Sequence, residues 1–286
     1  MIKNLVIQIG ITQQALKLDK GTGDTGPYRF TKSSILMEKN MAILMADLSG
    51  YTAMTDVHGG ASAAMLVKKY MAMVDQAITG STKLIQRVGD QIVLLAEKPD
   101  DILATAIALN KLIHNENHFL SIHAGVHYGS VFIEDGNLFG STINIASRIM
   151  NMAEQGEILC SSQLFERVGL HGHSFKHLGE FSFKNALYLT SVYELKIERA
   201  GLLSIDPVCR MQVDPVKESY SYRYQGKEYH FCGKRCWSIF HDQPVVFGDN
   251  SSHNTHLSNQ FKKVTGLTPS HFKTIGQDRR KPLDKV

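Results

Sequence analysis

The chain has 286 residues, of which 43% are hydrophobic and 20% are charged. This is the composition of a globular protein, and it excludes a largely disordered chain, a fibrous repeat and a membrane bundle. The length predicts one large domain with a smaller one, or two domains. The formal charge is +4, and residues 249–286 carry seven basic against three acidic side chains, which accounts for the whole excess. As a hint of nucleic-acid binding, this charge is weak.

The sequence points to the cytoplasm. No stretch reaches the ~18–20 apolar residues of a membrane-spanning helix. The run Leu5–Ile11 lacks the apolar core and cleavage site of a signal peptide. Three of the four cysteines lie within residues 209–236, and in a cytosolic chain such crowding favours metal binding over disulfides. We therefore expect a cytoplasmic protein with no membrane association.

The first half of the chain alternates predicted strands and helices. Residues 1–36 have no clear periodicity, so we expect a weakly ordered leader there. The apolar run Ala42–Ala46 predicts a buried strand, and the apolar spacing in Ser62–Ile78 predicts a helix. Leu84–Ala96 then predicts two strands joined by a turn at Val88–Gln91.

Further elements follow the same alternation. Asp101–Ile113 predicts a second helix, and Phe119–Phe132 predicts two strands broken at Gly129. Ser141–Met152 predicts a third helix, and alternating residues up to Tyr193 supply the last strands. This order indicates an α+β sheet with helices on one face.

Two acidic residues and one helix face carry candidate chemistry. Asp47 ends the apolar run and Asp90 sits at the hairpin tip, so neighbouring strands would bring both carboxylates to one sheet edge, where they suit Mg²⁺ or Mn²⁺. Alternatively, Asp47 caps a helix and Asp90 is a turn residue. Asn144 and Arg148 share a helix face, and arginine pairs with phosphate oxygens. Alternatively, this helix face is an ordinary exposed polar surface.

Four ordered segments resemble the class III nucleotidyl cyclase catalytic domain over about residues 41–197. The matching segments are Ala46–Thr52 (ADLSGYT), Val88–Asp90 (VGD), Gly125–Gly129 (GVHYG) and Phe139–Arg148 (FGSTINIASR). The resemblance implies a ferredoxin-like α+β nucleotidyl cyclase fold. It also favours catalytic roles for the two aspartates and for the helix face that carries Asn144 and Arg148.

The resemblance implies a role for each matched residue. Asp47 and Asp90 match the ligands of two Mg²⁺ or Mn²⁺ ions per active site, with the Leu48 carbonyl as an auxiliary ligand. Asn144 matches the residue that orients the ribose, and Arg148 matches the one that stabilises charge on the α-phosphate. Lys184, in Leu178–Lys184 (LGEFSFK), falls where the family keeps a polyphosphate-binding lysine.

Base selection departs from the family pattern. The positions that usually carry Lys and Asp in adenylyl cyclases are Gln86 and Asn137, and each amide can both donate and accept. Arg87 would supply a cation only if the strand register slipped by one residue. The substrate is therefore ATP or GTP, with ATP favoured by family frequency alone. Because the family builds its site between two catalytic domains and this chain has one, we expect a homodimer.

The segment of residues 203–248 contains three closely spaced cysteines and resembles a YHS domain. Cys209 lies in Asp206–Met211 (DPVCRM), and Cys232 and Cys236 lie in Tyr229–Cys236 (YHFCGKRC). Further matches are Val213, Tyr224, Gly226, Lys227, Phe240 and Pro244. The resemblance implies a small α+β module, and the three thiolates would suit a soft metal such as Zn or Cu.

The fourth ligand of such a site is open. His230, Met211 and His241 are candidates, and a solvent-open site is equally consistent. Arg210 replaces the family glycine and would be expected to crowd the site. Alternatively, the three cysteines are small buried hydrophobes.

The basic tail, residues 249–286, contains His256–Phe272 (HLSNQFKKVTGLTPSHF), which resembles the end of an AraC-type helix-turn-helix domain. We expect a helical appendage there. Because the first helix-turn-helix unit is missing and the fragment is too short to bury a core, we do not expect DNA binding.

The sequence thus predicts a leader (1–36), a cyclase catalytic domain (37–200), a metal-binding YHS-like module (203–248) and the basic tail. The leading hypothesis is a cyclase regulated by metal at the module. Alternatives are a catalytically weak nucleotide- or metal-responsive signalling protein, because Gln86 and Asn137 misread the base, and a transcription regulator that uses the tail.

Overall fold

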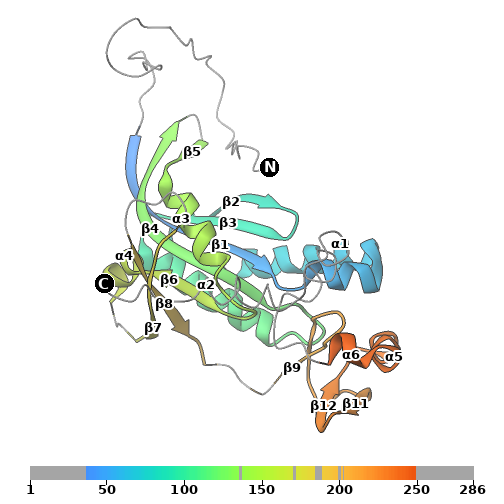
Figure 1. Cartoon of the computed structure of the whole chain (residues 1–286). Helices are drawn as coiled ribbons and strands as arrows, with labels where there is room; N and C mark the ends of the chain where they lie inside the picture. Colours follow the sequence, from blue (N-terminus) through green and yellow to red (C-terminus); the bar gives the residue numbers. More distant parts are fainter. Residues whose placement is uncertain are drawn as a thin grey trace, which may run out of the picture.

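The computed structural model describes residues 37–134, 137–169, 172–183, 189–198, 201 and 203–248. The predicted leader and the predicted basic tail both lie outside these residues. The described part forms a large domain, residues 37–198, and a cysteine module, residues 203–248 (Figure 1). No helix within the described ranges has the length and apolar character needed to cross a bilayer.

The large domain is built on a mixed eight-stranded sheet. The strand order is β2-β3-β1-β4-β6-β8-β7, and β5 pairs with β4. Only the β4–β6 pair is parallel among these strands. The strands are β1 (Met37–Leu48), β2 (Lys83–Val88), β3 (Gln91–Ala96), β4 (Ile122–Glu134), β5 (Asn137–Phe139), β6 (Ile158–Ser161), β7 (Ser174–Phe181) and β8 (Thr190–Lys196).

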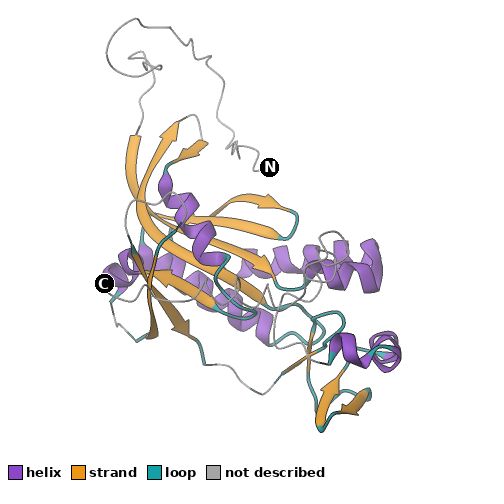
Figure 2. Ribbon diagram, in the orientation of Figure 1, coloured by secondary structure: helices purple, strands orange, loops and turns teal. Residues whose placement is uncertain are grey.

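Four helices cover the two faces of this sheet. They are α1 (Tyr51–Ala77), α2 (Pro99–His114), α3 (Ser141–Met150) and α4 (Ser162–Val168). Buried side chains of α1, α2 and α4 pack in one core with Leu44 and Leu94, whereas α3 packs on the other face against Ile43 and Val93 (Figures 1 and 2). The prediction of helices on one face is therefore wrong. Because Ala42–Ala46 is buried throughout, β1 needs cover on both faces.

The prediction of two strands broken at Gly129 is also wrong. β4 runs through Gly129 and pairs with β1 from Leu48↔Ile122 to Met37↔Ile133. The predicted hairpin at Val88–Gln91 is confirmed, and Gly89 adopts the left-handed backbone (φ 65°) that its turn requires. α1 begins earlier than predicted and is interrupted at Gly59, whose φ of 84° is not helical.

The cysteine module has a small aromatic core of its own. Its elements are β9 (Ser204–Ile205), β10 (Gln212–Val213), β11 (Ser221–Tyr224), β12 (Lys227–His230), α5 (Lys234–Asp242) and α6 (Pro244–Phe247). Phe231 and Phe240 are fully buried and pack with Cys209 and Cys236. Val57 of α1 joins this core, so the core reaches into the large domain.

Backbone hydrogen bonds join the module to the large domain. The Gln212 amide donates to the carbonyl of Phe119 (2.7 Å), and the His118 amide donates to the carbonyl of Gln212 (2.9 Å). The Gln212 side chain donates to the carbonyl of Ile113 at the end of α2 (3.0 Å). The module is therefore docked on the edge of the large domain near the start of β4.

Candidate functional site

The structure brings Asp47 and Asp90 together. Asp47 is the penultimate residue of β1, and Asp90 occupies the turn between β2 and β3. β3 pairs with β1 in a register that ends at Ala46↔Ile92, and this pairing places the hairpin tip beside the end of β1. Both side chains are partly buried, and the two carboxyl groups hydrogen-bond each other. The predicted meeting of the two carboxylates at one sheet edge is observed.

The doubly ionised state of Asp47 and Asp90 is unfavourable, because both side chains are partly buried and the two charges are adjacent. Burial, together with the neighbouring Asp47, raises the pKa of Asp90 to about 7. Burial also raises the pKa of Asp47, although the Leu48 amide hydrogen-bonds both carboxyl groups. The Asp47 Oδ1 atom is buried and has no hydrogen-bond partner among the described residues. Two adjacent carboxylates with an unpartnered oxygen are the donor set that a hard divalent cation takes.

Sequence reasoning missed two residues beside this pair. His123 of β4 lies directly opposite Asp47 in the register, and its Nδ1 is 3.0 Å from the Ser49 hydroxyl. The Ser49 amide donates to the carbonyl of Ser121 (2.8 Å). Together these bonds fix the backbone that follows Asp47. The only signal in the sequence was that Ser49 lies within the ADLSGYT segment.

Gln86 lies on the same face of the sheet as Asp47, which shares the face of Met45 by the alternation of β1. A register shift between Leu84 and Gln86 places Gln86 opposite Val93 and Arg87 opposite Ile92. Because Val93 packs on the α3 face and Ile92 on the other, Arg87 faces away from the site. The Gln86 Oε1 atom is buried without a hydrogen-bond partner in the described part of the chain. Gln86, not Arg87, is therefore placed to meet a ligand.

Asn144 and Arg148 lie together on α3, which packs against β4 at very close range. A Cβ atom at Gly125 would lie 2.2 Å from the Met150 amide nitrogen and 2.4 Å from the Ala146 carbonyl oxygen. Among the described residues, neither Asn144 nor Arg148 bonds to the carboxyl pair of the same chain. The two predicted halves of the site thus exist as separate groups within one chain.

Two predicted site residues cannot be placed in the same way. Lys184 lies outside the described residues. Asn137 is the first residue of β5, and its side chain is also outside the described part.

A family model decides the identity of the large domain. Residues 36–196, more than half of the chain, match the adenylate and guanylate cyclase catalytic domain. The chain belongs to this family. Residues 204–247 match the YHS domain, so the cysteine module is a YHS module that follows the cyclase domain.

Curated relatives and solved structures agree with this assignment. A pH-sensitive adenylate cyclase from Mycobacterium tuberculosis is 26% identical over 131 residues, which are 46% of this chain and 33% of the relative. An adenylate cyclase from Glutamicibacter nicotianae is 28% identical over 119 residues, which are 41% of this chain and 30% of the relative. The chain thus spans about a third of the length of these relatives.

The likeness to solved structures establishes the cyclase fold. The adenylyl cyclase CyaB from P. aeruginosa superposes with a TM-score of 0.52 at 18% identity, covering 58% of this chain and 98% of that one. The catalytic core of a rhodopsin-guanylyl cyclase with converted specificity, in complex with ATPαS, also gives a TM-score of 0.52. Its identity is 16%, over 57% of this chain and 98% of that one. The predicted α+β nucleotidyl cyclase fold is confirmed.

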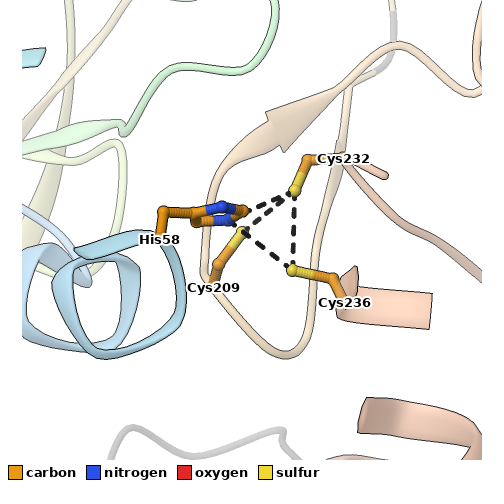
Figure 3. A group of neighbouring side chains, drawn as sticks. All are labelled: His58, Cys209, Cys232 and Cys236. Carbon is orange, nitrogen blue, oxygen red and sulfur yellow. Dashed lines mark hydrogen bonds between the residues drawn. The ribbon is translucent and has the colours of Figure 1, made fainter. Parts of the chain in front are cut away.

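The YHS module and the cyclase domain share a second cluster of potential ligands. Cys209, Cys232 and Cys236 of the module converge with His58 of α1, and their ligand atoms all lie within 4.8 Å of one another (Figure 3). The Cys232 Sγ is 3.5 Å from each of the other two sulfurs and from the His58 Nε2. The His58 Nε2 is 3.7 Å from the Cys236 Sγ.

The three predicted candidates for the fourth ligand are not part of this cluster. His241 is exposed and stacks on Trp237, and Met211 packs in the hydrophobic cores of both domains. His230 has a buried Nδ1 with no partner among the described residues. The fourth member is His58, whose distance from the cysteines in sequence hid it from spacing arguments.

The expected crowding by Arg210 is not observed either. Arg210 adopts a left-handed backbone (φ 69°), which explains why a glycine suits this position. Its side chain leaves the cysteines and bonds to Gln155 Oε1 of the cyclase domain (2.8 Å). The three sulfurs converge beside it without obstruction.

A buried aspartate organises the cysteine loops. Asp206 accepts hydrogen bonds from the amides of Val208 (2.8 Å), Cys209 (3.3 Å) and Cys232 (2.8 Å). Burial raises the pKa of Asp206 to about 6. The thiols of Cys209 and Cys236 lower the pKa of the Cys232 thiol far below its ordinary value by hydrogen bonding to it.

Proposed function

We propose that the chain is a class III nucleotidyl cyclase that converts a purine nucleoside triphosphate, ATP in preference to GTP, to the 3′,5′-cyclic nucleotide and pyrophosphate. In this reaction the ribose 3′-oxygen forms a bond to the α-phosphorus while the bond to the pyrophosphate breaks, and the hydroxyl proton passes to solvent. The observation that carries the proposal is the half-buried pair Asp47 and Asp90, which meet in a domain whose family is established.

The carboxyl pair fits the divalent cations that the family implies. Asp47 and Asp90 would hold two Mg²⁺ or Mn²⁺ ions, with the Leu48 carbonyl as an auxiliary ligand. When bound, such ions lower the pKa of the attacking hydroxyl and neutralise charge on the triphosphate. The unpartnered Asp47 Oδ1 supports this assignment, because a buried carboxylate oxygen needs a cation or a donor.

The remaining residues bind and orient the substrate. Asn144 would hold the ribose, and Arg148 would donate hydrogen bonds to the α-phosphate as its charge grows. Gln86 would contact the base, since its Oε1 is unpartnered in the described chain and its face is that of the aspartates. Both curated relatives described above are named adenylate cyclases, which supports ATP.

We further propose that the active site forms between two copies of the chain. Within one chain Asn144 and Arg148 make no bond to the carboxyl pair among the described residues. A twofold dimer would make two equivalent sites, each with aspartates from one copy and α3 from the other. Phe132 and Phe139 support an interface, because they pair across β4 and β5 and both remain exposed.

A turnover assay with ATP or GTP, and with Mg²⁺ or Mn²⁺, tests the function. Asp90→Asn should lower the rate by about 10³-fold or more, because it removes a ligand charge worth several kcal/mol. Asp100→Asn, at the exposed start of α2, is the matched control and should retain the rate. Absence of cyclic product from the wild type under every condition would overturn the proposal.

Mixing two inactive variants tests the shared site. In an equal mixture of Asp90→Asn and Arg148→Ala chains, a mixed dimer has one site with both changes and one intact site. Random mixing should therefore restore about a quarter of the wild-type rate. No recovery, with mixed dimers demonstrated by differently tagged chains, would show that each chain builds its own site.

A further inference from the structure

The donor atoms of His58, Cys209, Cys232 and Cys236 have the spacing of a tetrahedral metal site. Zn–S bonds of ~2.3 Å and a Zn–N bond of ~2.0 Å place sulfurs about 3.8 Å apart and nitrogen about 3.5 Å from sulfur. The Cys232 Sγ lies 3.5 Å from the other two sulfurs, and the His58 Nε2 lies 3.5 Å from the Cys232 Sγ and 3.7 Å from the Cys236 Sγ. The remaining two distances, from the Cys209 Sγ to the Cys236 Sγ and to the His58 Nε2, are within 4.8 Å. A disulfide would need sulfurs ~2.05 Å apart, and all three cysteines are free.

The four donors come from two domains. The three sulfurs belong to the YHS module, whereas His58 belongs to α1 of the cyclase domain (Figure 3). His58 is the last residue before the break in α1 at Gly59, and the Ser62 hydroxyl donates to its carbonyl (2.9 Å). An ion bound here would therefore tie the module to the short first segment of α1, residues 51–58.

The active-site loop, defined here as residues 47–50, comprises the end of β1 with Asp47 and the turn that leads into that first segment of α1. Gly50 precedes the helix, and a Cβ atom there would lie 2.3 Å from the Arg210 Cβ, so the module touches the loop directly. Arg210 also exchanges hydrogen bonds with Gln155, at 2.8 Å and 3.2 Å. The loop thus lies between the sheet, through Ser49, and the module, through Arg210 and the His58 cluster.

We propose that His58, Cys209, Cys232 and Cys236 bind one divalent ion of the Zn²⁺ class between the two domains, and that this ion holds residues 47–58 in the arrangement that the active site requires. The metal would act on catalysis without touching the substrate. The second half of this proposal rests on the proposed cyclase activity. The first half is independent of that activity.

Cobalt titration of the full chain tests the binding site. With excess Mg²⁺ present to fill the carboxylate site, one Co²⁺ per chain should give the intense visible bands of tetrahedral cobalt and thiolate charge-transfer absorption. His58→Ala should weaken binding by about 100-fold or more, given that even indirect partners of a metal cost 10–100-fold. His58→Cys should restore a tetrahedral spectrum with four thiolates. His241→Ala, in the YHS module but outside the cluster, should behave as wild type.

Equal affinity and an identical spectrum in wild type and His58→Ala would overturn the four-ligand site. Such a result would assign metal binding to the three cysteines alone. The cobalt spectrum needs no cyclase activity, so this outcome is separate from any failure of the proposed function.

Hydrogen–deuterium exchange tests the link between the metal and the active-site loop. Adding one equivalent of Zn²⁺ should slow exchange in residues 47–58 of the wild type but not of His58→Ala. Arg210→Gly keeps all four ligands and removes the second contact, so its metal affinity should be unchanged while the protection of the loop is smaller. If Zn²⁺ did not change the exchange rate of the loop in the wild type, the coupling would be refuted.

Turnover provides the functional readout of the same link. Stripping Zn²⁺ with a chelator, at saturating Mg²⁺ or Mn²⁺, should lower the cyclase rate by about 10- to 100-fold, the scale of a displacement near 1 Å at a reacting centre. His58→Ala should show the low rate with or without Zn²⁺. A wild-type rate that does not change when Zn²⁺ is removed would refute the coupling. Absence of turnover under every condition would refute the proposed cyclase activity, and the exchange experiment would then decide the coupling.

Discussion

Gly125→Ala is the sharpest test of how the fold positions the catalytic helix. A methyl group at this position would lie 2.2 Å from the Met150 nitrogen and 2.4 Å from the Ala146 oxygen. Both are backbone atoms of α3, so no side chain can rotate to make room. Since ordinary contacts are ~3.5 Å, the helix has to retreat by about 1 Å.

The retreat of α3 would have two measurable consequences. Overpacking between β4 and α3 should destabilise the protein by about 1–3 kcal/mol, measured as a lower urea midpoint. The helix carries Asn144 and Arg148, and a shift of this size should lower the cyclase rate by about 100-fold at a temperature where the variant is folded.

Gly60→Ala is the matched control for this substitution. Gly60 is helical, and a Cβ atom there would meet nothing within 4 Å. Its substitution should be neutral or stabilise by up to about 1 kcal/mol. If Gly125→Ala kept both the wild-type midpoint and a rate within about twofold of wild type, the close approach of α3 to β4 would not set the catalytic geometry.

Three further predictions concern buried polar groups. Burial lowers the pKa of His127 from 6.5 to about 4. Between these pH values the unfolded chain binds a proton at His127 that the folded protein does not bind. The free energy of unfolding should therefore fall by about 3 kcal/mol as the pH drops from 6.5 to 4. Urea unfolding across this range should show a shallower pH slope for His127→Gln, and an equal slope would contradict the assignment. Asp206→Ala should weaken Co²⁺ binding by about 10–100-fold in a chelator competition, because it removes the hydrogen bond that holds the Cys232 amide. Unchanged affinity would show that the cysteine loops keep their conformation without Asp206. Tyr70→Phe should raise the unfolding free energy by about 1 kcal/mol, since the buried Tyr70 hydroxyl has no partner among the described residues, and a lower midpoint would argue against this.

The parts of the fold that the sequence predicted best have strong local signals. Ala42–Ala46 is apolar at every position and lies in β1, and Val88–Gln91 has the glycine that its hairpin turn requires. Gly129 gave a misleading local signal. The local pattern predicts a strand break at Gly129, but the strand continues, and a Cβ atom there would meet the Thr142 Oγ1 at 2.7 Å. The glycine serves the packing of α3, which a local pattern cannot show.

The two candidate sites differ in how far the sequence could define them. Asp47 and Asp90 each lie in a short family segment, so the resemblance alone is enough to pair them. His58 lies in no such segment, and it precedes Cys232 by 174 residues. A single histidine on a helix has no ligand spacing of its own, so only the docking of the module on α1 reveals it.

Arg210 connects a strained turn of the YHS module to the contact between the domains. A left-handed backbone costs a non-glycine residue roughly 1 kcal/mol, and the Arg210 side chain donates a hydrogen bond to Gln155 of the cyclase domain. Arg210 also contacts Gly50 and accepts a hydrogen bond from the Gln155 side chain, and both residues belong to the cyclase domain. Contacts across the interface therefore contribute to offsetting the strain of this turn. Gly50 directly precedes the helix segment that ends at His58. The contact between Arg210 and Gly50 therefore places the module against residues 47–58, which connect the two candidate metal sites.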